Sequence, residues 1–395
     1  MDHAATGAEL LAAEAARMAG RLPDVQFESI DGTIDLTWGH PDPSLFAVDD
    51  VAAATSAVLR EHGWQALTYG APFGAAHTRS AVAALLTGTD APVDPGQVVI
   101  TGGSSGGLDV LLTVLAVPGD VVFVEQPTYF LALRMFADHG LHVVGLAGDD
   151  DGPVPAAFEA GVAAARADGR SAFLYLVPTF ANPTGRCLPQ QRQVELLDIA
   201  RDHGVHVIED DVYRDTSAAA PPSMWSIDHD VLRLGSFSKS LSPGLRIGYL
   251  TAGREKVARI GGCGLMDSGG GVNHFASMIV GELLHSGRFA HIAAAGQQCY
   301  AARRAALAGA LDRSLFDFTM PDGGYFIWLG LPAGVSSTAA VQAARANGVL
   351  VSNCRNFFVD EPTVGAVRVS FSMLDDALLI EGARRLNDAV AALVR

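Results

Sequence analysis

Short hydrophobic runs rich in valine, isoleucine and leucine alternate with alanine-rich stretches along most of the chain. Runs of this kind predict strands that are buried on both faces of a sheet, and the stretches between them predict helices. The alternation is typical of a mostly parallel α/β sheet. The expected strands are 98–101, 121–125, 143–146, 172–176, 205–210, 231–234 and 248–251, and the expected helices are 107–117, 129–139, 155–167 and 189–203.

The pattern changes after about residue 280. A long helix rich in alanine and arginine is expected over 292–314, followed by strands 325–329, 349–352 and 367–371 and a last helix from Asp375. This order predicts a separate α+β domain. We therefore expect a large domain over residues 45–285 and a small domain built from residues 1–44 and 286–395. The glycine-rich stretch 261–271 is expected to be a flexible loop near the functional site.

Composition narrows the classes of partner. The chain has 395 residues and a formal net charge of −16 without any basic run, so we expect neither nucleic acid nor a membrane surface as a partner. Its start lacks the pattern of a signal peptide, and no apolar run is long enough to span a membrane. The four cysteines lie far apart without a C-x-x-C motif. We therefore expect no metal site, and free thiols in a cytoplasmic protein.

One of the two lysines in the chain lies in a segment suited to a covalent aldehyde cofactor. Residues 235–246 read GSFSKSLSPGLR, with Lys239 between serines and Arg246 seven residues after it. The amine can form a Schiff base, and the hydroxyl groups and the guanidinium can hold a phosphate. A surface lysine in a serine- and glycine-rich loop is the alternative when this segment is taken alone.

A second segment places small residues between an expected strand and an expected helix. Residues 101–108 read TGGSSGGL, with the helix expected to start near Gly106. The free N–H groups and the positive end of the dipole make a helix N-terminus a phosphate site. A dinucleotide site is the rival interpretation, because Glu125 ends the next strand as a ribose-binding acid would. The G-x-G-x-x-G pattern, however, would need glycine in place of Ser104 or Ser105.

Three acids end an expected buried strand. Glu209, Asp210 and Asp211 follow Val207 and Ile208 directly, and buried carboxylates are unfavourable unless another group pairs with them. They either emerge into solvent, or one of them pairs with a cationic ligand such as a protonated pyridine nitrogen.

The order of these segments resembles that of the class I and II aminotransferases. The motifs S-x-x-G, E-x-P-x-Y, N-P-T-G, D-x-x-Y, S-x-S-K and P-G-L-R follow one another along the chain. The chain is similar to this family from about Ile34 onward, and most similar to the aminoadipate and kynurenine aminotransferase branch. The resemblance implies an α/β fold of type I, in which a large domain with a mostly parallel seven-stranded sheet between helices is joined by a small α+β domain. It also implies pyridoxal 5′-phosphate as the cofactor.

The resemblance assigns roles to individual residues. Lys239 would carry the cofactor as a Schiff base and move the substrate proton, Asp210 would keep the pyridine nitrogen protonated, and Tyr129 would stack on the ring. These three are the expected catalytic residues. The other expected cofactor contacts are Asn182 and Tyr213 at the ring oxygen, and Ser104, Ser105, Gly106, Ser236, Ser238 and Arg246 at the phosphate.

The resemblance also implies a homodimer with shared sites that acts on an amino acid and a 2-oxo acid. Tyr69 matches the tyrosine that reaches a neighbour's phosphate in this family. Arg368, in an otherwise apolar strand, matches the arginine that binds the substrate α-carboxylate through two parallel hydrogen bonds. Gly39 would lie against that carboxylate through its backbone, and Asn182 would border the substrate.

Three segments depart from the family pattern. Ser105 and Gly106 stand where glutamines are often found, and Asn353-Cys354 stands where a Pro-Gly pair is usual. The third departure is 296–298, which reads GQQ where a Leu-Arg pair is common. The last two leave the substrate and the outcome of the reaction open.

Alternative functions follow from these departures. An L-amino acid would transfer its amine to a 2-oxo acid in the leading interpretation. The same cofactor could instead support elimination, replacement, decarboxylation or carbon–carbon bond formation, with the same catalytic residues. A regulator with an aminotransferase-like domain is a third alternative, and DNA retention at low salt would reveal it. Arg355 is a candidate for binding a second carboxylate of the substrate.

Overall fold

The structure is a computed structural model that describes residues 32–394, and the expectations for residues 1–31 lie outside them. Seven strands form its largest sheet, in the order β2-β10-β9-β8-β7-β3-β4. They are β2 (Val98–Thr101), β3 (Val121–Val124), β4 (His142–Gly145), β7 (Ala172–Leu176), β8 (His206–Asp210), β9 (Leu232–Ser236) and β10 (Gly248–Thr251). Only β10 runs antiparallel to its neighbours. The expected mostly parallel sheet is therefore confirmed.

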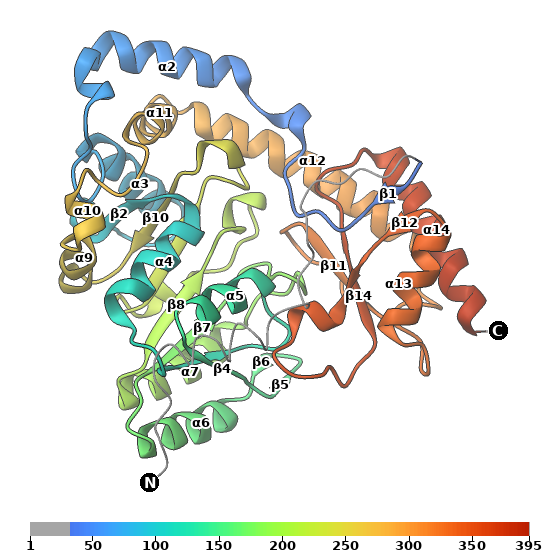
Figure 1. Ribbon diagram of the computed structural model, residues 1–395. Coiled ribbons are helices and arrows are strands. Elements are labelled where there is room, and N and C mark those ends of the chain that lie inside the picture. The colour runs from blue at the N-terminus through green and yellow to red at the C-terminus, as the bar shows by residue number, and fades with distance from the viewer. Residues whose placement is uncertain (1–31, 395) are drawn as a thin grey trace.

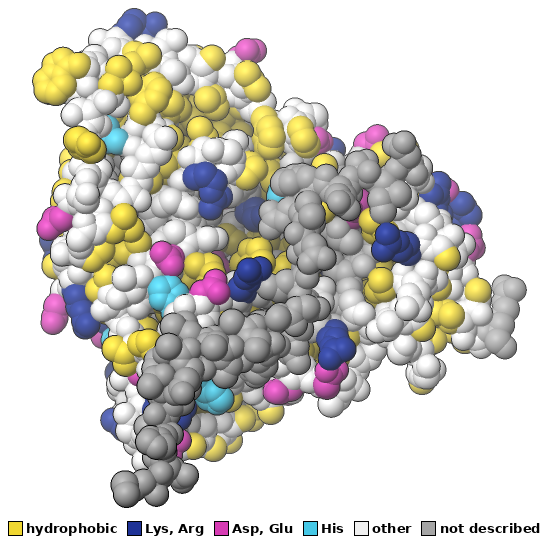
Figure 2. Space-filling model, in the orientation of Figure 1, with side chains coloured by type: hydrophobic (Ala, Val, Ile, Leu, Met, Phe, Trp, Pro, Cys, Tyr) yellow, Lys and Arg dark blue, Asp and Glu magenta, His cyan; other side chains and the backbone are white. Residues whose placement is uncertain are grey.

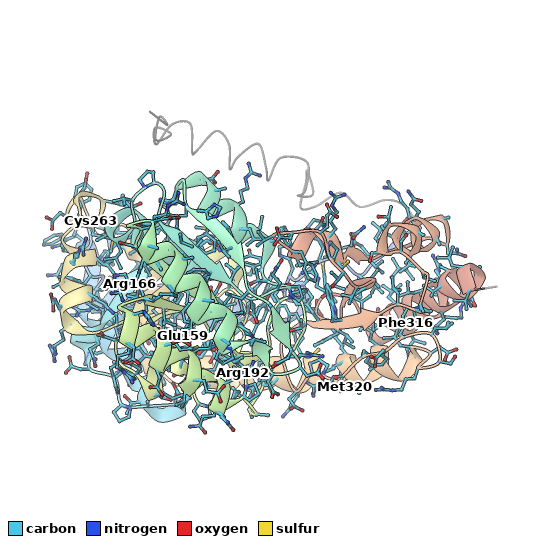
Figure 3. The ribbon with its side chains drawn as sticks, turned by 90° about the horizontal axis from the view of Figure 1, so that it is seen from below. Glu159, Arg166, Arg192, Cys263, Phe316 and Met320 are labelled. Carbon is cyan, nitrogen blue, oxygen red and sulfur yellow. The ribbon has the colours of Figure 1, made fainter. Side chains whose placement is uncertain are left out.

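Helices cover both faces of this sheet (Figure 1). Leu111 of α4 lies in one hydrophobic core and Phe158 of α6 in another, so the sheet separates two apolar layers. Figure 3 shows α6 and α7 side by side, with Arg166 and Arg192 on them. The helices of this part are α2 (Val48–His62), α3 (Ala76–Thr89), α4 (Gly103–Leu115), α5 (Phe130–Asp138), α6 (Pro155–Ala167), α7 (Gln190–His203), α8 (Met224–Ile227), α9 (Arg254–Gly261), α10 (Gly264–Asp267) and α11 (His274–His285).

A second, smaller group of elements lies beside the large sheet. The helix α12 (Arg288–Ala310) leads from one part to the other, as Figure 1 shows. A three-stranded antiparallel sheet follows, with β14 (Ala366–Ser370) between β11 (Phe326–Gly330) and β13 (Ser352–Asn353). The helices α13 (Ser337–Ala346) and α14 (Asp376–Val394) pack with it, which agrees with the expected α+β arrangement. The expected domain boundaries, which divide a large domain over residues 45–285 from a small domain, stay a prediction.

Short elements complete the fold. The strand β1 (Ile34–Asp35) pairs in parallel with β12 (Val349–Leu350), and β5 (Gly148–Asp149) pairs with β6 (Gly152–Pro153). The pairing of β1 places the start of the described chain against the small part. The 3₁₀ helices are η1 (Pro43–Leu45), η2 (Gly63–Leu67), η3 (Pro95–Gln97), η4 (Arg214–Thr216), η5 (Pro243–Leu245) and η6 (Cys354–Phe357).

Local capping explains several helix ends. Asn273 accepts a hydrogen bond from the backbone N–H of Ala276 at the start of α11, and Ser336 caps α13 in the same way. Such side chains satisfy N–H groups that have no partner within the helix. The helix α7 ends at Gly204, whose φ of 62° suits glycine best.

Three expected boundaries were clearly wrong. The helix α4 begins at Gly103, because its glycines form the first turn instead of a preceding loop. The helix α12 spans Arg288–Ala310 instead of 292–314, starting after Gly287 in the left-handed region. The expected strand 349–352 is divided between β12 and β13, which belong to different sheets. The stretch 261–271 contains the last residue of α9 and all of α10, with turns and loop residues around them, and its flexibility stays a prediction.

Within residues 32–394, the helices are all too short or too polar to cross a membrane.

Candidate active site

Lys239 lies just after β9, half-buried at the carboxyl edge of the sheet. Its Nζ donates a hydrogen bond to the backbone oxygen of Gly39 at 2.7 Å. The rings of Tyr213 and Tyr325 lie 5.7 and 5.6 Å from Nζ, and the Tyr325 hydroxyl donates to the backbone oxygen of Lys239. Burial, together with the positive charge of Arg368, lowers the pKa of the Lys239 amine to about 8. About a tenth of the amine is therefore neutral, and nucleophilic, at pH 7, far more than for a lysine with the ordinary pKa.

Asp210 is the last residue of β8 and is buried. Its Oδ2 accepts a hydrogen bond of 2.6 Å from the hydroxyl of Tyr175, whereas its Oδ1 is buried with no hydrogen-bond partner among the described residues. Burial raises the pKa of Asp210 to about 6, although the hydrogen bond from Tyr175 and the charge of Lys239 oppose this shift. The free oxygen can accept a hydrogen bond from a ligand.

The two acids beside Asp210 have donors within the protein. The carboxylate of Glu209 accepts the backbone N–H groups of Met224 and Trp225, both at 2.9 Å. Asp211 forms ion pairs with Arg214 and Arg233, whose side chains are buried with it. The three acids therefore do not emerge into solvent. Asp210 and Asp211 each keep one buried oxygen without a hydrogen-bond partner among the described residues, but only Asp210 has no arginine paired with its carboxylate.

The side chain of Arg246, which follows η5, lies beside the first turn of α4. Its Nη2 donates to the backbone oxygen of Gly102 at 3.2 Å and its Nη1 to the hydroxyl of Ser238 at 3.3 Å. The backbone N–H of Ser238 in turn donates to the hydroxyl of Ser236. Ser104, Ser105 and Gly106 lie in the first turn of α4. The expected phosphate residues thus come from the start of α4 and from the end of β9, and these two segments meet at the Arg246 side chain.

Arg368 projects from β14 into the same region. Its Nη1 donates to Oδ1 of Asn182 at 2.8 Å, and its Nη2 donates to the backbone oxygen of Thr37 and the hydroxyl of Ser352. Its Nε is buried with no hydrogen-bond partner among the described residues. Burial lowers the pKa of Arg368 to about 10, which leaves the guanidinium charged at neutral pH. The side chain can therefore still donate to an anion.

Two aromatic rings hold the guanidinium of Arg368. Its central carbon lies 3.9 Å from the ring centre of Phe326 and 4.8 Å from that of Phe357. Contacts of this geometry fix the plane of the group. A fixed plane favours a carboxylate that approaches from one direction.

Tyr129 and Tyr213 border the same space. Burial is the main reason that the pKa of Tyr129 is raised, and the charges that act on it are Asp210, Arg368 and Arg246. The pKa of Tyr213 is also raised, mainly by burial, and its side chain contacts Asn182. Both phenols therefore stay protonated. The charges of Asp210, Arg368 and Arg246, three of the four charged groups that the resemblance assigned to the cofactor and the substrate, all shift the pKa of Tyr129.

Two expected residues lie apart from this cluster. Tyr69 is 85% exposed and follows η2, whose Trp64 and Leu67 are exposed as well, so that these three side chains form a surface patch. Figure 2 shows hydrophobic side chains gathered over this end of the molecule, around α2 and α11. Arg355 is exposed and pairs with Glu361, so the suggestion that it binds a second substrate carboxylate is not supported.

Several neighbours of the site escaped the sequence analysis. Tyr175 and Tyr325 hydrogen-bond to Asp210 and Lys239, and Phe326 and Phe357 pack on Arg368. Tyr175 lies in a strand that was predicted correctly, so the register of β7 against β8 would have identified it. The other contacts join segments whose relative placement only the fold supplies.

Pyridoxal phosphate, the cofactor that the resemblance implies, suits the groups present. Asp210 Oδ1 is an acceptor that needs a donor, as a protonated ring nitrogen would supply. A Cβ at Gly102 or Gly106 would meet no atom within 4 Å, which leaves open space beside the cationic Arg246. Among residues 32–394, no group of three or more histidine, cysteine, aspartate or glutamate side chains is arranged to hold a metal ion.

Comparisons of the sequence and the structure with known proteins agree with the geometry of this site. The sequence profile of "Aminotransferase class I and II" matches residues 33–386. The chain is 32% identical to 2-aminoadipate transaminase of Thermus thermophilus, over 92% of this chain and 91% of that protein. The multiple substrate aminotransferase of Thermococcus profundus superposes with a TM-score of 0.85 at 27% identity, covering 97% of this chain and 95% of the other.

A kynurenine aminotransferase of Pyrococcus horikoshii, solved with PMP and kynurenine, gives the same TM-score at 25% identity and covers 100% of this chain and 96% of its own. These similarities extend over nearly the whole chain, including the described segments that form the site. They also agree with the fold type and the cofactor that the motifs implied. The chain belongs to the class I and II aminotransferase family and is a pyridoxal-phosphate-dependent enzyme of fold type I.

Proposed function

We propose that this aminotransferase moves the amino group of an L-amino acid to a 2-oxo acid at a site formed by Lys239, Asp210 and Arg368. One observation supports the assignment of this site most directly. Three functional groups from separate segments of the chain occur together. They are the Lys239 amine, whose pKa is lowered, the Asp210 carboxylate, with one buried oxygen free, and the Arg368 guanidinium, with its buried Nε free. The free atoms of Asp210 and Arg368 need partners that the cofactor and the substrate supply, and the Lys239 amine, now bonded to the backbone oxygen of Gly39, can react with the cofactor aldehyde.

The cofactor would be held from several sides. Asp210 accepts from the ring nitrogen, Tyr129 covers the ring, and Asn182 and Tyr213 donate to the ring oxygen. Pyridoxal phosphate, when bound, supplies an aldehyde that bonds to amines and a ring that takes up electrons from the substrate Cα. The phosphate would be bound by the side chains of Ser104, Ser105, Ser236, Ser238 and Arg246 and by backbone N–H groups from Gly106 onward.

Lys239 has two roles in this proposal. It holds the cofactor until an amino acid replaces it, and its freed Nζ then removes the proton from the substrate Cα. The lowered pKa matters for the second role, because only the neutral amine can accept a proton. The charge of Arg368, one of the causes of that lowered pKa, also binds the substrate carboxylate. Gly39, whose backbone oxygen now accepts from Nζ, would lie beside that carboxylate.

Arg368→Gln is expected to raise KM for the amino donor by roughly 10- to 100-fold, since it removes charged hydrogen bonds to the α-carboxylate. Arg368→Lys should recover little of this loss, because an ammonium cannot match the planar fork of the guanidinium. Steady-state kinetics with one amino donor measures both effects. Arg355→Gln is the matched control, as its exposed side chain pairs with Glu361 and should change KM less than about twofold. An unchanged KM in Arg368→Gln would contradict the assignment.

The functional unit is proposed to be a homodimer. The patch of Trp64, Leu67 and Tyr69 exposes large apolar side chains, each at least 67% accessible. Such a patch on a single chain favours association with another protein surface. Tyr69 would then reach the phosphate site of the second copy. Light scattering of the purified protein should give twice the mass of one chain, and a monomer at working concentration would contradict this part of the proposal.

A cytoplasmic location is proposed on the state of the cysteines. Cys187, Cys263, Cys299 and Cys354 are all unpaired, which is the usual state in a reducing compartment. Retention of the enzyme in the cytosolic fraction of its cells would test this.

The reaction itself is tested by a half-reaction. The cofactor-loaded protein is mixed with a panel of aromatic, aliphatic and acidic amino acids, without any 2-oxo acid. Conversion of the cofactor to pyridoxamine phosphate by one member of the panel would support transamination and identify the donor. Release of ammonia, carbon dioxide or a side-chain fragment without pyridoxamine phosphate would instead support elimination, replacement or decarboxylation at the same residues.

A further inference from the structure

We propose that Tyr175 is a positioning residue for Asp210, holding one carboxylate oxygen so that the proton shared with the cofactor stays on the ring nitrogen. This inference rests on the proposed cofactor site and adds to it a residue outside that site. Tyr175 would touch neither cofactor nor substrate. It would act only through the carboxylate of Asp210.

The two side chains are brought together by strand register. In the parallel pair β7–β8, Tyr175 lies opposite Ile208, two residues before Asp210. Side chains two residues apart on a strand point to the same face, so Tyr175 and Asp210 share one face of the sheet. The phenol ring is fully buried and packs edge-on against Phe136, with 5.2 Å between ring centres. The position of the hydroxyl is therefore fixed before any ligand binds.

The hydroxyl of Tyr175 has one hydrogen to donate, and Asp210 Oδ2 receives it at 2.6 Å. Burial raises the pKa of Tyr175 well above its usual value, so the phenol remains a donor at any working pH. The contact ties down Oδ2 and leaves Oδ1 as the one oxygen of Asp210 without a partner in the described chain. The carboxylate thus has one oxygen for the protein and one for the ligand.

The direction of the effect follows from the charges around Asp210. Burial raises its pKa to about 6, the hydrogen bond from Tyr175 lowers it, Asp211 raises it, and Lys239 lowers it. Without the hydrogen bond, the carboxylate would bind a proton more tightly. The single proton between Oδ1 and the ring nitrogen would then move toward the oxygen. A ring nitrogen without its proton accepts electrons poorly, so removal of the Cα proton would slow.

The direct test uses the cofactor labelled with ¹⁵N at the ring nitrogen and bound to the parent, Tyr175→Phe and Tyr249→Phe proteins. The ¹⁵N chemical shift reports whether the nitrogen carries a proton, and it is followed against pH. Tyr249→Phe is the matched control, because Tyr249 is another buried phenol of the same sheet, on β10, next to Phe237. Steady-state kinetics separates kcat from KM in each protein.

We expect the ring nitrogen of Tyr175→Phe to be less fully protonated than in the parent at every pH below its titration, because part of the population then carries the shared proton on Asp210, with kcat about tenfold lower and KM for the amino donor within about twofold. Tyr249→Phe should match the parent. In an Asp210→Asn background, Tyr175→Phe should lower kcat no further, since the two residues act through one contact. A ¹⁵N titration of Tyr175→Phe identical to that of Tyr249→Phe would overturn the proposal.

A second variant guards against a folding defect in Tyr175→Phe. Genetically encoded 3-fluorotyrosine at position 175 keeps the shape of the side chain and donates a stronger hydrogen bond. It should keep or raise the protonated fraction of the ring nitrogen relative to the parent, and a lower protonated fraction would overturn the proposal. If the parent bound no cofactor at all, the proposed function and this inference would fail together. If it bound cofactor but formed no pyridoxamine phosphate, transamination alone would fail and the ¹⁵N result would still decide the role of Tyr175.

Discussion

Lys239→Ala is expected to abolish transamination, with kcat lower than that of the parent by at least about 10⁴-fold. The variant loses both the amine that holds the cofactor and the base that removes the Cα proton, and proton transfer by a positioned base alone contributes up to about that factor. Alanine also removes the hydrogen bond from Nζ to the backbone oxygen of Gly39. Turnover with a saturating amino donor and 2-oxo acid, in the presence of added cofactor, measures the loss.

The other lysine of the chain provides the control. Lys256 lies on α9, where its side chain donates to the backbone oxygen of Asp230 on the surface of the large part. Lys256→Ala should leave kcat within about twofold of the parent, as expected for a surface substitution. Turnover of Lys239→Ala at the parent rate would show that the family resemblance has been carried to the wrong residue.

Asp210→Asn is expected to lower kcat/KM by about 10²- to 10³-fold, the usual effect of removing one preorganised electrostatic contact. The amide keeps the shape of the side chain but carries no charge to hold a proton on the ring nitrogen. Half-reaction rates measured by stopped-flow absorbance isolate the affected step. The affinity of the apoprotein for the cofactor should also fall, which a titration of the apoprotein with cofactor would measure.

The neighbouring acids make this prediction specific. Glu209→Gln should reduce stability, because the buried N–H groups of Met224 and Trp225 lose a charged acceptor, yet it should retain most of the activity. Asp211→Asn should lower the free energy of unfolding by about 3–5 kcal/mol, since the buried Arg233 and Arg214 would keep only Asp90 as an acidic partner. A large loss of kcat in Glu209→Gln with an unchanged rate in Asp210→Asn would reverse the assignment.

The strands were the most predictable part of the fold, for a physical reason. Strands such as 172–176 and 248–251 are buried on both faces, so that a continuous apolar run marks them without knowledge of their neighbours. The long helix α12 was placed four residues too late at each end. Its alanines and arginines lie on all sides of the helix, and no clear apolar face marks its ends.

The site was predictable where one residue type carries the chemistry. Lys239, the three acids 209–211 and Arg368 stood out because an amine among serines, acids that end an apolar strand and an arginine within one each need a special reason, and the family resemblance then selected Asp210 among the acids. The partners of these groups were not predictable. Whether Arg355 faces the substrate depends on its pairing with Glu361 in the folded chain, and whether Tyr69 is functional depends on a second copy of the chain.

The central claim is that Lys239 holds the cofactor, and covalent trapping tests it most directly. Borohydride makes the bond between a lysine amine and the cofactor aldehyde carbon permanent, so that digestion and mass spectrometry can locate it. With two lysines in the chain, the result has few possible outcomes. The account predicts the cofactor mass on the peptide that contains Lys239 and none on the peptide that contains Lys256. Cofactor on Lys256, or on neither peptide after loading, would contradict the account.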